Sequence, residues 1–233
     1  MSTPSSVIYD ASNNVISSSD LVNAVHQAGY GTTGQVFASN GPNVKPTFQT
    51  APAGATGTWA LISSASASVS STIDFANLLT STYRQYKLLG FNILVLTNNT
   101  NPQFIIGTGA TPTWQTGAGA YSWDAYGSLN SLSTVGGSAA DTFIRANVNT
   151  GVSNSAVWPI DIECNIVNPS NASYYARVYG TCNALGQANI NQALGSTFHG
   201  AYLTAGAITS IRFQMSSGTI TSGTFQLWGL VGS

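Results

Sequence analysis

Two carboxylates placed two positions apart, Asp161 and Glu163, are the residues whose types and spacing first suggest chemistry. Residues i and i+2 of a β-strand project from the same face of a sheet. Two carboxylates on one face can hydrolyse a glycosidic bond when they flank it as acid and base or nucleophile. Here Arg177 is expected to lie across the neighbouring strand and to neutralise the pair in part. Because no separate acid, base and water site can be assembled, we interpret the pair as structural and predict no catalytic residue.

Histidines and cysteines are too sparse to build a metal or redox centre. Neither His26 nor His199 has a cysteine, an aspartate or a second histidine at the spacing of metal ligands. We therefore expect both histidines at a polar surface or interface, and we predict no metal. Two cysteines, Cys164 and Cys182, cannot form a disulfide framework. They are predicted to be reduced, small residues of the core.

A glycine-rich segment at residues 29–34 (GYGTTG) has the spacing of a dinucleotide-binding loop. Such a loop works only between a strand and a helix, with an acidic residue about 20 positions further on. In this chain a helical pattern precedes the glycines, residues 39–42 (SNGP) would break any element after them, and no acid lies near position 54. The glycines therefore predict linker turns, and no cofactor is expected.

Four aromatic residues, Trp114, Tyr121, Trp123 and Tyr126, lie close together in a stretch rich in glycine, alanine and threonine. Tyr121 and Trp123 alternate as strand residues do, and we expect them to anchor the core. Trp114, flanked by proline and glycine, is expected in a loop. Exposed aromatic rings can stack on the apolar CH faces of sugars. Trp114 and Tyr126 are accordingly the candidate receptor contacts.

The elements that position these residues are suggested by the composition. The chain has 233 residues and a net charge of −1, and only 6% of its residues are charged, against about 25% in ordinary soluble domains. Without a basic run it has no electrostatic footprint for nucleic acid or an anionic membrane surface. No secretion signal and no apolar run of membrane-spanning length are found. Serine, threonine, asparagine and glycine favour turns and strands, so the composition favours an all-β protein.

Residues 1–58 differ from the rest in having few aromatics and many turn residues. One short helix is predicted there, with Leu21, Val22 and Val25 on one face and Gly29 at its end. Two turns of helix are not stable alone. We therefore expect these three apolar residues to be buried against other copies of the chain or against another surface. Prolines and glycines further on predict an extended linker.

Residues 59–233 carry short strand patterns separated by clusters of glycine, asparagine and proline. Strands are expected at 68–75, 86–97, 103–107, 120–126, 142–148, 160–167, 174–181, 208–215 and 224–230. The sequence has neither a long helical pattern nor an alternation of strands and helices that would indicate a parallel sheet. These features predict one antiparallel, jelly-roll-like β-sandwich.

The hairpin formed by the strands 160–167 and 174–181 can be registered from its two-residue alternation. A loop at 168–172 places Glu163 opposite Arg177 and keeps the apolar residues on one face, whereas a shift of one residue mixes the faces. In this register Cys164 and Cys182 lie about five residue pairs apart, roughly 16 Å by strand rise, which is beyond the reach of a disulfide.

Two stretches of the sequence resemble structural proteins of tailed bacteriophages. Residues 31–41 (GTTGQVFASNG) and 45–52 (KPTFQTAP) are similar to a tail-fibre linker that reads roughly GTTGQVLTSNG…PTWQ. Phe37 replaces the usual leucine of that linker, and Phe48 replaces the usual tryptophan.

The second stretch, residues 208–230 (ITSIRFQMSSGTITSGTFQLWGL), is similar to the C-terminal ending of many phage fibre and tail domains, roughly SGNIxSGTFxLYG. Thr219 stands where asparagine is frequent, and Trp228 stands where tyrosine is frequent. With the order of the segments between them, the two stretches extend the resemblance over roughly residues 31–233.

The resemblance implies a non-enzymatic virion protein, assembled in the cytoplasm of the host bacterium. A tail fibre or spike is implied, usually a homotrimer, with the N-terminal segment bound to other virion proteins and the β domain facing a host-surface glycan. A capsid decoration or head-fibre protein of the same fold is the alternative. A polysaccharide depolymerase is disfavoured by the short length and by the lack of a catalytic constellation.

Overall fold

The computed structural model describes residues 8–9, 15–16, 35–38, 40, 47–50, 57–129, 132–148, 151–186 and 192–232. The chain divides into two compact units, Met1–Ala53 and Gly54–Ser233. In the first unit, β1 (Ile8–Tyr9) pairs with β2 (Val15–Ile16), and β3 (Gln35–Ala38) pairs with β4 (Thr47–Thr50). The helix expected around Leu21, Val22 and Val25 falls outside the described residues.

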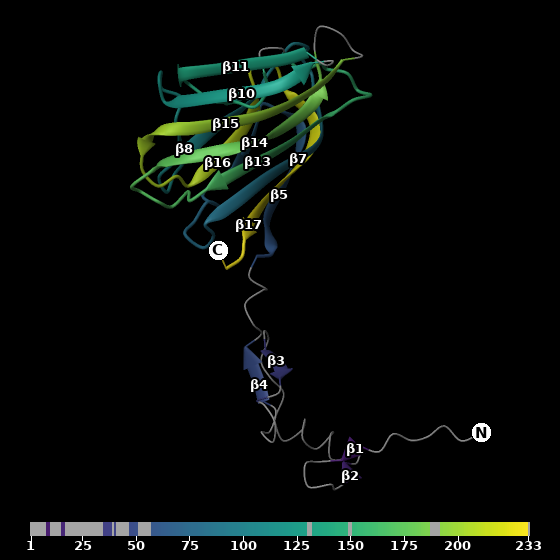
Figure 1. Cartoon of the computed structure of the whole chain (residues 1–233), viewed down its shortest axis with the longest axis vertical. Coiled ribbons are helices and arrows are strands. Elements are labelled where there is room, and N and C mark those ends of the chain that lie inside the picture. The colour runs from purple at the N-terminus through teal and green to yellow at the C-terminus, as the bar shows by residue number, and fades with distance from the viewer. Residues whose placement is uncertain are drawn as a thin grey trace, which may run out of the picture. The chain divides into compact units, whose positions relative to one another are not determined.

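The second unit consists of two antiparallel sheets. In spatial order, the large sheet contains β11 (Leu132–Asp141), β10 (Tyr121–Leu129), β15 (Ala193–Ala205), β14 (Tyr175–Leu185), β13 (Ile160–Val167), β7 (Gln85–Val95), β17 (Ile220–Leu230) and β5 (Trp59–Ser70) (Figure 1). The small sheet contains β12 (Ile144–Arg145), β8 (Pro102–Thr108), β16 (Ser210–Met215) and β6 (Thr72–Phe75), with β9 (Thr113–Trp114) paired to β8.

The order of the strands is that of a jelly roll. Eight strands form its two four-stranded layers, β5-β17-β7-β13 in the large sheet and β6-β16-β8-β12 in the small sheet. They make four antiparallel pairs, β5–β17, β6–β16, β7–β13 and β8–β12, which belong alternately to the large and the small sheet. The hairpins β14–β15 and β10–β11 are insertions that continue the first sheet beyond β13. The predicted antiparallel jelly-roll-like β-sandwich is thus confirmed, and no helix occurs in the described part of the chain.

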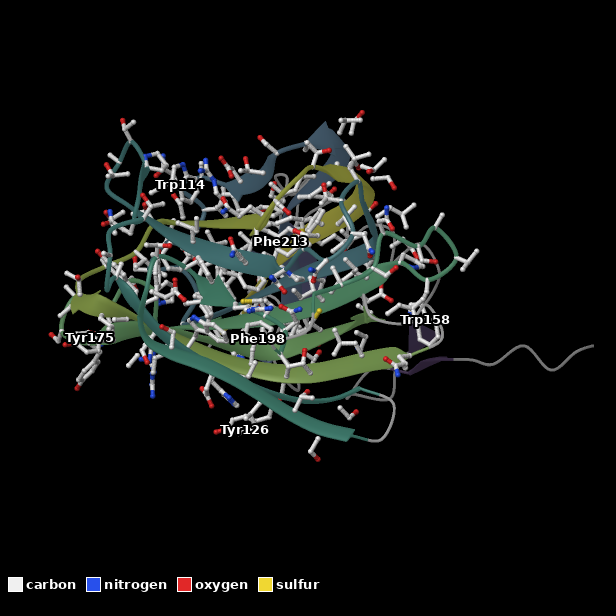
Figure 2. All side chains as sticks on the ribbon, turned by 90° about the horizontal axis from the view of Figure 1, so that it is seen from above. Trp114, Tyr126, Trp158, Tyr175, Phe198 and Phe213 are labelled. Atoms are coloured by element: carbon white, nitrogen blue, oxygen red, sulfur yellow. The ribbon has the colours of Figure 1, made fainter. Side chains whose placement is uncertain are left out.

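Aromatic rings from both sheets fill the space between them. Phe104 of β8 stacks on Phe198 of β15 with ring centroids 5.6 Å apart, and Phe213 of β16 lies 5.1 Å from Phe225 of β17. All four side chains are completely buried. Figure 2 shows Phe198 and Phe213 between the two layers. Because each buried aromatic contributes about 1.5–3 kcal/mol, this cluster is a principal source of stability.

Tyr121 and Trp123 belong to the core, as predicted. The buried Tyr121 hydroxyl donates to the carbonyl of Gln115 at 2.8 Å and accepts from the backbone amide of Ile106 at 2.9 Å, and burial raises the pKa of this phenol. The indole of Trp123 donates to Asp141 at 2.9 Å. Both polar atoms are therefore satisfied inside the sandwich.

The predicted register of the β13–β14 hairpin is wrong by four residues. Glu163 faces Thr181, and Arg177 faces Val167. The connection spans residues 168–174, two residues more than the predicted loop. It is bonded to other segments: the Asn168 amide donates to the carbonyl of Arg84, and the Ile208 amide donates to the carbonyl of Pro169. A four-residue shift keeps every side chain on its predicted face, so the apolar side of both strands is as expected.

Two other strand patterns are interrupted where the backbone turns to positive φ. A single strand over 68–75, with Val69 on the face of Phe75, is incorrect: Val69 has φ 52°, its side chain is exposed, and the chain crosses there from β5 to β6. In 86–97 the pattern predicts Phe91 and Ile93 on one face. Instead Asn92 has φ 52° and forms a bulge, after which Ile93 is buried while Phe91 faces outward.

Candidate functional site on the outer face of the large sheet

The outer face of the large sheet, turned away from the small sheet, carries polar and aromatic side chains in register. Alternation along each strand points one set of residues inward and the other outward. The pairing aligns the outward residues of β10, β15, β14, β13 and β7 in three adjacent rows. The first row is Ser122, Ala201, Arg177, Val167 and Gln85. The second is Asp124, His199, Tyr179, Asn165 and Lys87, and the third is Tyr126, Thr197, Thr181, Glu163 and Leu89.

This face is hollowed over β10, β15 and β14. The hollow, here named the outer groove, has a volume of about 430 Å³, and its outward-facing lining residues are Ser122, Asp124, Val167, Arg177, Tyr179, His199 and Ala201. It forms because the first row has small residues, Ser122 and Ala201, beside the larger His199 and Tyr179 of the second row. A second hollow of about 470 Å³ lies beside Tyr126 on the same strands.

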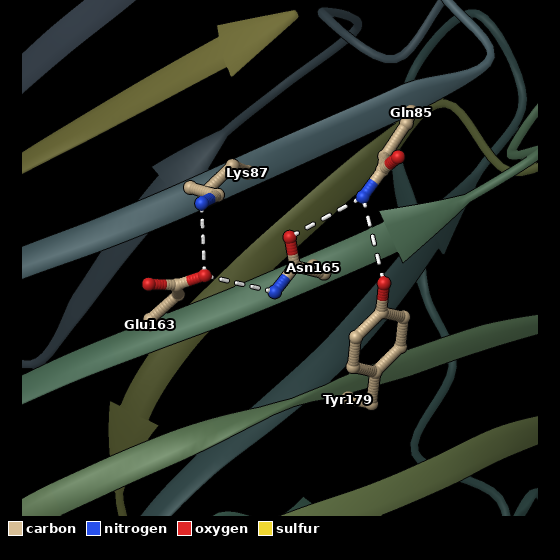
Figure 3. Close-up of polar contacts among 5 residues, drawn as sticks. All are labelled: Gln85, Lys87, Glu163, Asn165 and Tyr179. Carbon is tan, nitrogen blue, oxygen red and sulfur yellow. Dashed lines mark hydrogen bonds and ion pairs between the residues drawn. The ribbon is translucent and has the colours of Figure 1, made fainter. Parts of the chain in front are cut away.

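A polar network fixes the side chains next to the outer groove (Figure 3). The Lys87 ammonium lies 2.9 Å from Glu163 Oε1, and the Asn165 amide donates to the same oxygen at 3.1 Å. Gln85 Nε2 donates to Asn165 Oδ1 at 3.4 Å and to the Tyr179 hydroxyl at 3.5 Å. The hydrogen bond from Lys87 lowers the pKa of Glu163, against the opposing effect of burial. The network thus holds Tyr179 in place and neutralises one acid.

The predicted neutralisation of Glu163 by Arg177 is therefore wrong, because the four-residue shift in register moves Arg177 to the first row. The partner of Glu163 is Lys87, on the opposite side of β13. Asp161 also faces outward and accepts a hydrogen bond at 3.0 Å from the backbone amide of Asn92, at the bulge of β7. Both carboxylates of the i, i+2 pair thus have structural partners.

His199 and Asp124 lie side by side on one wall of the outer groove. Nδ1 of the histidine is 3.9 Å from Oδ1 of the aspartate, a distance at which they form an ion pair only when the imidazole is protonated. Both side chains are about half exposed. His199 is at a polar surface, and its site was not evident from the sequence because the pairing of β15 with β10 creates it.

The two aromatic residues proposed as receptor contacts lie on different sheets. Tyr126 projects from the outer face of the large sheet and is 54% exposed. Trp114 belongs to β9 beside the small sheet, and the guanidinium of Arg212 lies 4.2 Å from its ring centroid. Figure 2 shows Trp114 and Tyr126 on opposite sides of the sandwich, so the fold does not combine them into one site. The anchoring residues Leu21, Val22 and Val25 are outside the described residues.

Tyr179, and the place of Arg177 in the outer groove, were not predicted from the sequence. Their two-residue spacing in the predicted strand 174–181 was a signal, because it puts both on one face. What the sequence lacked was the identity of the neighbouring strand, which supplies the opposite wall of the groove.

Cys164 and Cys182 are both free and fully buried, as predicted. The separation predicted for them is wrong, since Cys182 faces Ile162, only two positions from Cys164. Within the described residues, no group of three or more histidine, cysteine or acidic side chains could hold a metal ion. Nor does the described part of the chain contain a helix long and apolar enough to cross a membrane.

No protein-family model, no curated protein and no solved structure matches this chain.

Proposed function

We propose that the protein is a non-enzymatic structural protein of a bacteriophage virion, a tail fibre or spike whose β-sandwich contacts a glycan on the host surface. The proposal rests on the arrangement of side chains on the outer face of the large sheet. There, hydroxyl, amide and phenol groups stand in register beside two hollows of about 430 and 470 Å³. Volumes of this size are those of small-ligand sites.

The side chains of this face have the chemistry that saccharides require. Tyr126 and Tyr179 expose aromatic rings, on which the apolar faces of sugars can pack. Thr181 and Thr197 supply hydroxyl groups, and Asp124 supplies a carboxylate that accepts hydrogen bonds from sugar hydroxyls. All of them project from a rigid sheet, so little ordering is needed when a ligand binds.

The resemblance to phage fibre domains supports the virion assignment, and the fold gives the resembling residues structural roles. Gly218 has φ 75°, and a Cβ there would lie 2.1 Å from Thr97 Oγ1. Phe225 and Leu227, later in the same motif, are fully buried in β17. The motif therefore forms the turn before β17 and the buried face of β17, an interior strand of the large sheet between β7 and the edge strand β5.

The position on the particle can be tested by gold-labelled antibodies raised against the β-sandwich and applied to virions from a culture that produces the chain. Labelling of the tail tip or its fibres is expected. Labelling of the head would favour the alternative, a decoration or head-fibre protein. Absence of the chain from purified particles would refute both assignments.

Host contact requires a separate measurement. The purified full chain, labelled with a fluorophore, should bind host cells and reduce infection by the phage when added in excess. Failure to bind or to compete would contradict the receptor-binding role. Release of reducing ends from host polysaccharide would instead indicate a depolymerase.

The proposal includes a homotrimer held to the virion through residues 1–58. Light scattering of the full chain should give three times its mass of 24.1 kDa. A monodisperse monomer would contradict the oligomer. A chain that begins at Trp59 should fail to enter particles, and its incorporation would contradict the anchoring role of residues 1–58.

A further inference from the structure

Arg177 is a charged residue in the outer groove whose side chain has no ion pair or hydrogen bond with any other described residue. Other cations of the β-sandwich differ: Lys87 pairs with Glu163, and Arg212 forms two hydrogen bonds of 2.7 Å with Asp74. In a chain with only six lysines and arginines, an unengaged guanidinium that lines a hollow is a notable exception. It offers a forked set of donors that matches an oxyanion.

The neighbours of Arg177 leave room for a ligand. Across the sheet it faces Ala201 on one side and Val167 on the other, neither of which can occupy its donors. Tyr179 stands two residues further along β14 on the same face, and its hydroxyl is held by Gln85. A ring-shaped ligand bound to Arg177 can therefore extend over Ala201 and along Tyr179.

Asp124 limits where a negative group can bind in the outer groove. Asp124 lies two strands and one row from Arg177, roughly 12 Å by the strand spacing and the two-residue repeat. At physiological ionic strength the Debye length is about 8 Å, so Asp124 repels an anion at Arg177 only weakly. An anion near Asp124 itself would be repelled strongly. The groove thus has one end suited to an oxyanion and another suited to hydroxyl groups.

We propose, resting on the glycan-binding function proposed above, that the outer groove binds a sugar that carries an oxyanion, either the carboxylate of an acidic sugar or the phosphate of a phosphorylated one. Arg177 donates two parallel hydrogen bonds to the oxyanion. The ring of Tyr179 packs on the sugar, and Asp124 accepts hydrogen bonds from its hydroxyl groups.

Isothermal titration calorimetry on the full chain tests this inference with two matched pairs of probes. The first pair is trigalacturonic acid and its neutral methyl ester, and the second is glucose 6-phosphate and glucose. We expect one charged probe to bind at least about tenfold more tightly than its neutral partner, as loss of a charge-assisted bidentate contact implies. The pair that shows the larger preference identifies the carboxylate or the phosphate as the natural group.

Variants of two arginines provide the controls. Arg177→Gln should weaken binding of the charged probe about tenfold and leave its neutral partner unaffected, while Arg177→Lys should fall between, since lysine keeps the charge but not the fork. Arg212→Gln removes the same charge from the small sheet and should change the affinity less than about twofold, because that site is distant and screened. Equal melting temperatures of the parent and the Arg177 variants exclude a folding defect.

Equal affinity for charged and neutral probes, unchanged binding by Arg177→Gln, or no binding of any probe would overturn the inference. The proposed function is judged independently by particle labelling and host-cell binding. A fibre that binds host cells through a neutral glycan would keep the proposed function and refute the role of Arg177. A chain that binds the charged probe but is absent from virions would support the role of Arg177 and refute the proposed function.

Discussion

Gly180 of β14 lies so close to Glu163 of β13 that a Cβ at position 180 would stand 1.8 Å from the Glu163 carbonyl oxygen. The obstacle is the backbone of a paired strand, which cannot rotate away as a side chain can. This contact lies in the middle of the large sheet, between the two strands that carry the polar network and one wall of the outer groove. The sheet therefore requires glycine at this position.

The substitution Gly180→Ala should destabilise the fold by about 1–3 kcal/mol or more, because β13 and β14 must separate to admit the methyl group. The matched control is Gly206→Ala, where a Cβ would have no atom within 4 Å. That change should stay within about 0.5 kcal/mol of the parent. Urea denaturation measures both, and equal stabilities of the two variants would show that the strands yield readily at position 180.

The Lys87–Glu163 pair should make a small, pH-dependent contribution to stability. Since the pKa of Glu163 is lowered in the folded state, its contribution is present above the unfolded value of about 4.3 and is lost as the pH falls through the folded value. Glu163→Gln should therefore reduce the free energy of unfolding at pH 7, by no more than about 1 kcal/mol because the carboxylate is 39% exposed. A deficit that persists undiminished at pH 3 would contradict this electrostatic origin.

Replacing Trp114 and replacing Tyr126 by alanine should have different effects on stability and on attachment to host cells. Trp114→Ala removes the cation–π contact with Arg212 and should lower stability by about 1 kcal/mol. Tyr126→Ala removes an exposed ring and should change stability by less than about 0.5 kcal/mol, while weakening attachment to host cells. Thermal melts and cell-binding assays on the same preparations separate the two effects. A stable Tyr126→Ala variant with full cell binding would remove Tyr126 from the proposed receptor contacts.

The two cysteines should be unreactive in the native protein. Burial raises the pKa of Cys182 to about 12 and that of Cys164 further still, so neither forms the thiolate that alkylation requires. Iodoacetamide at pH 8 should modify neither residue until denaturant is added, when both should react. A non-reduced mass two daltons below that of the free thiols would instead reveal a disulfide.

Side-chain alternation in the sequence correctly indicated the buried faces of β10, β13 and β14, because alternation is a local property of each strand. It failed at Val69 and Phe91, which lie at or beside a residue of positive φ. The strand 160–167 has the predicted bounds, with Ile162 and Cys164 buried and Glu163 on the other face. Tyr121 and Trp123 enter the core for the same reason. Together with the turn residues, this pattern was enough to predict a jelly-roll-like sandwich.

Strands without apolar alternation were missed. The sequence pattern predicts no strand in 132–141 (LSTVGGSAAD) or in 193–205 (ALGSTFHGAYLTA), where small and polar residues predominate. These segments are strands because β10 and β14 provide partners for their backbone groups. Partner strands, and not intrinsic preference, decide the conformation of such segments.

The outer groove was decided by tertiary structure alone. Its walls come from Asp124, Arg177 and His199, on three strands that are adjacent only because two inserted hairpins extend the sheet. The sequence put Arg177 on an outward face, but it predicted no strand around His199, and it could not determine the register of the β13–β14 hairpin, since a shift of four residues leaves every face unchanged. Long-range bonds from Asn168 to Arg84 and from Ile208 to Pro169 accompany the longer connection that sets the register. The faces follow from local alternation, whereas the site depends on contacts between distant parts of the chain.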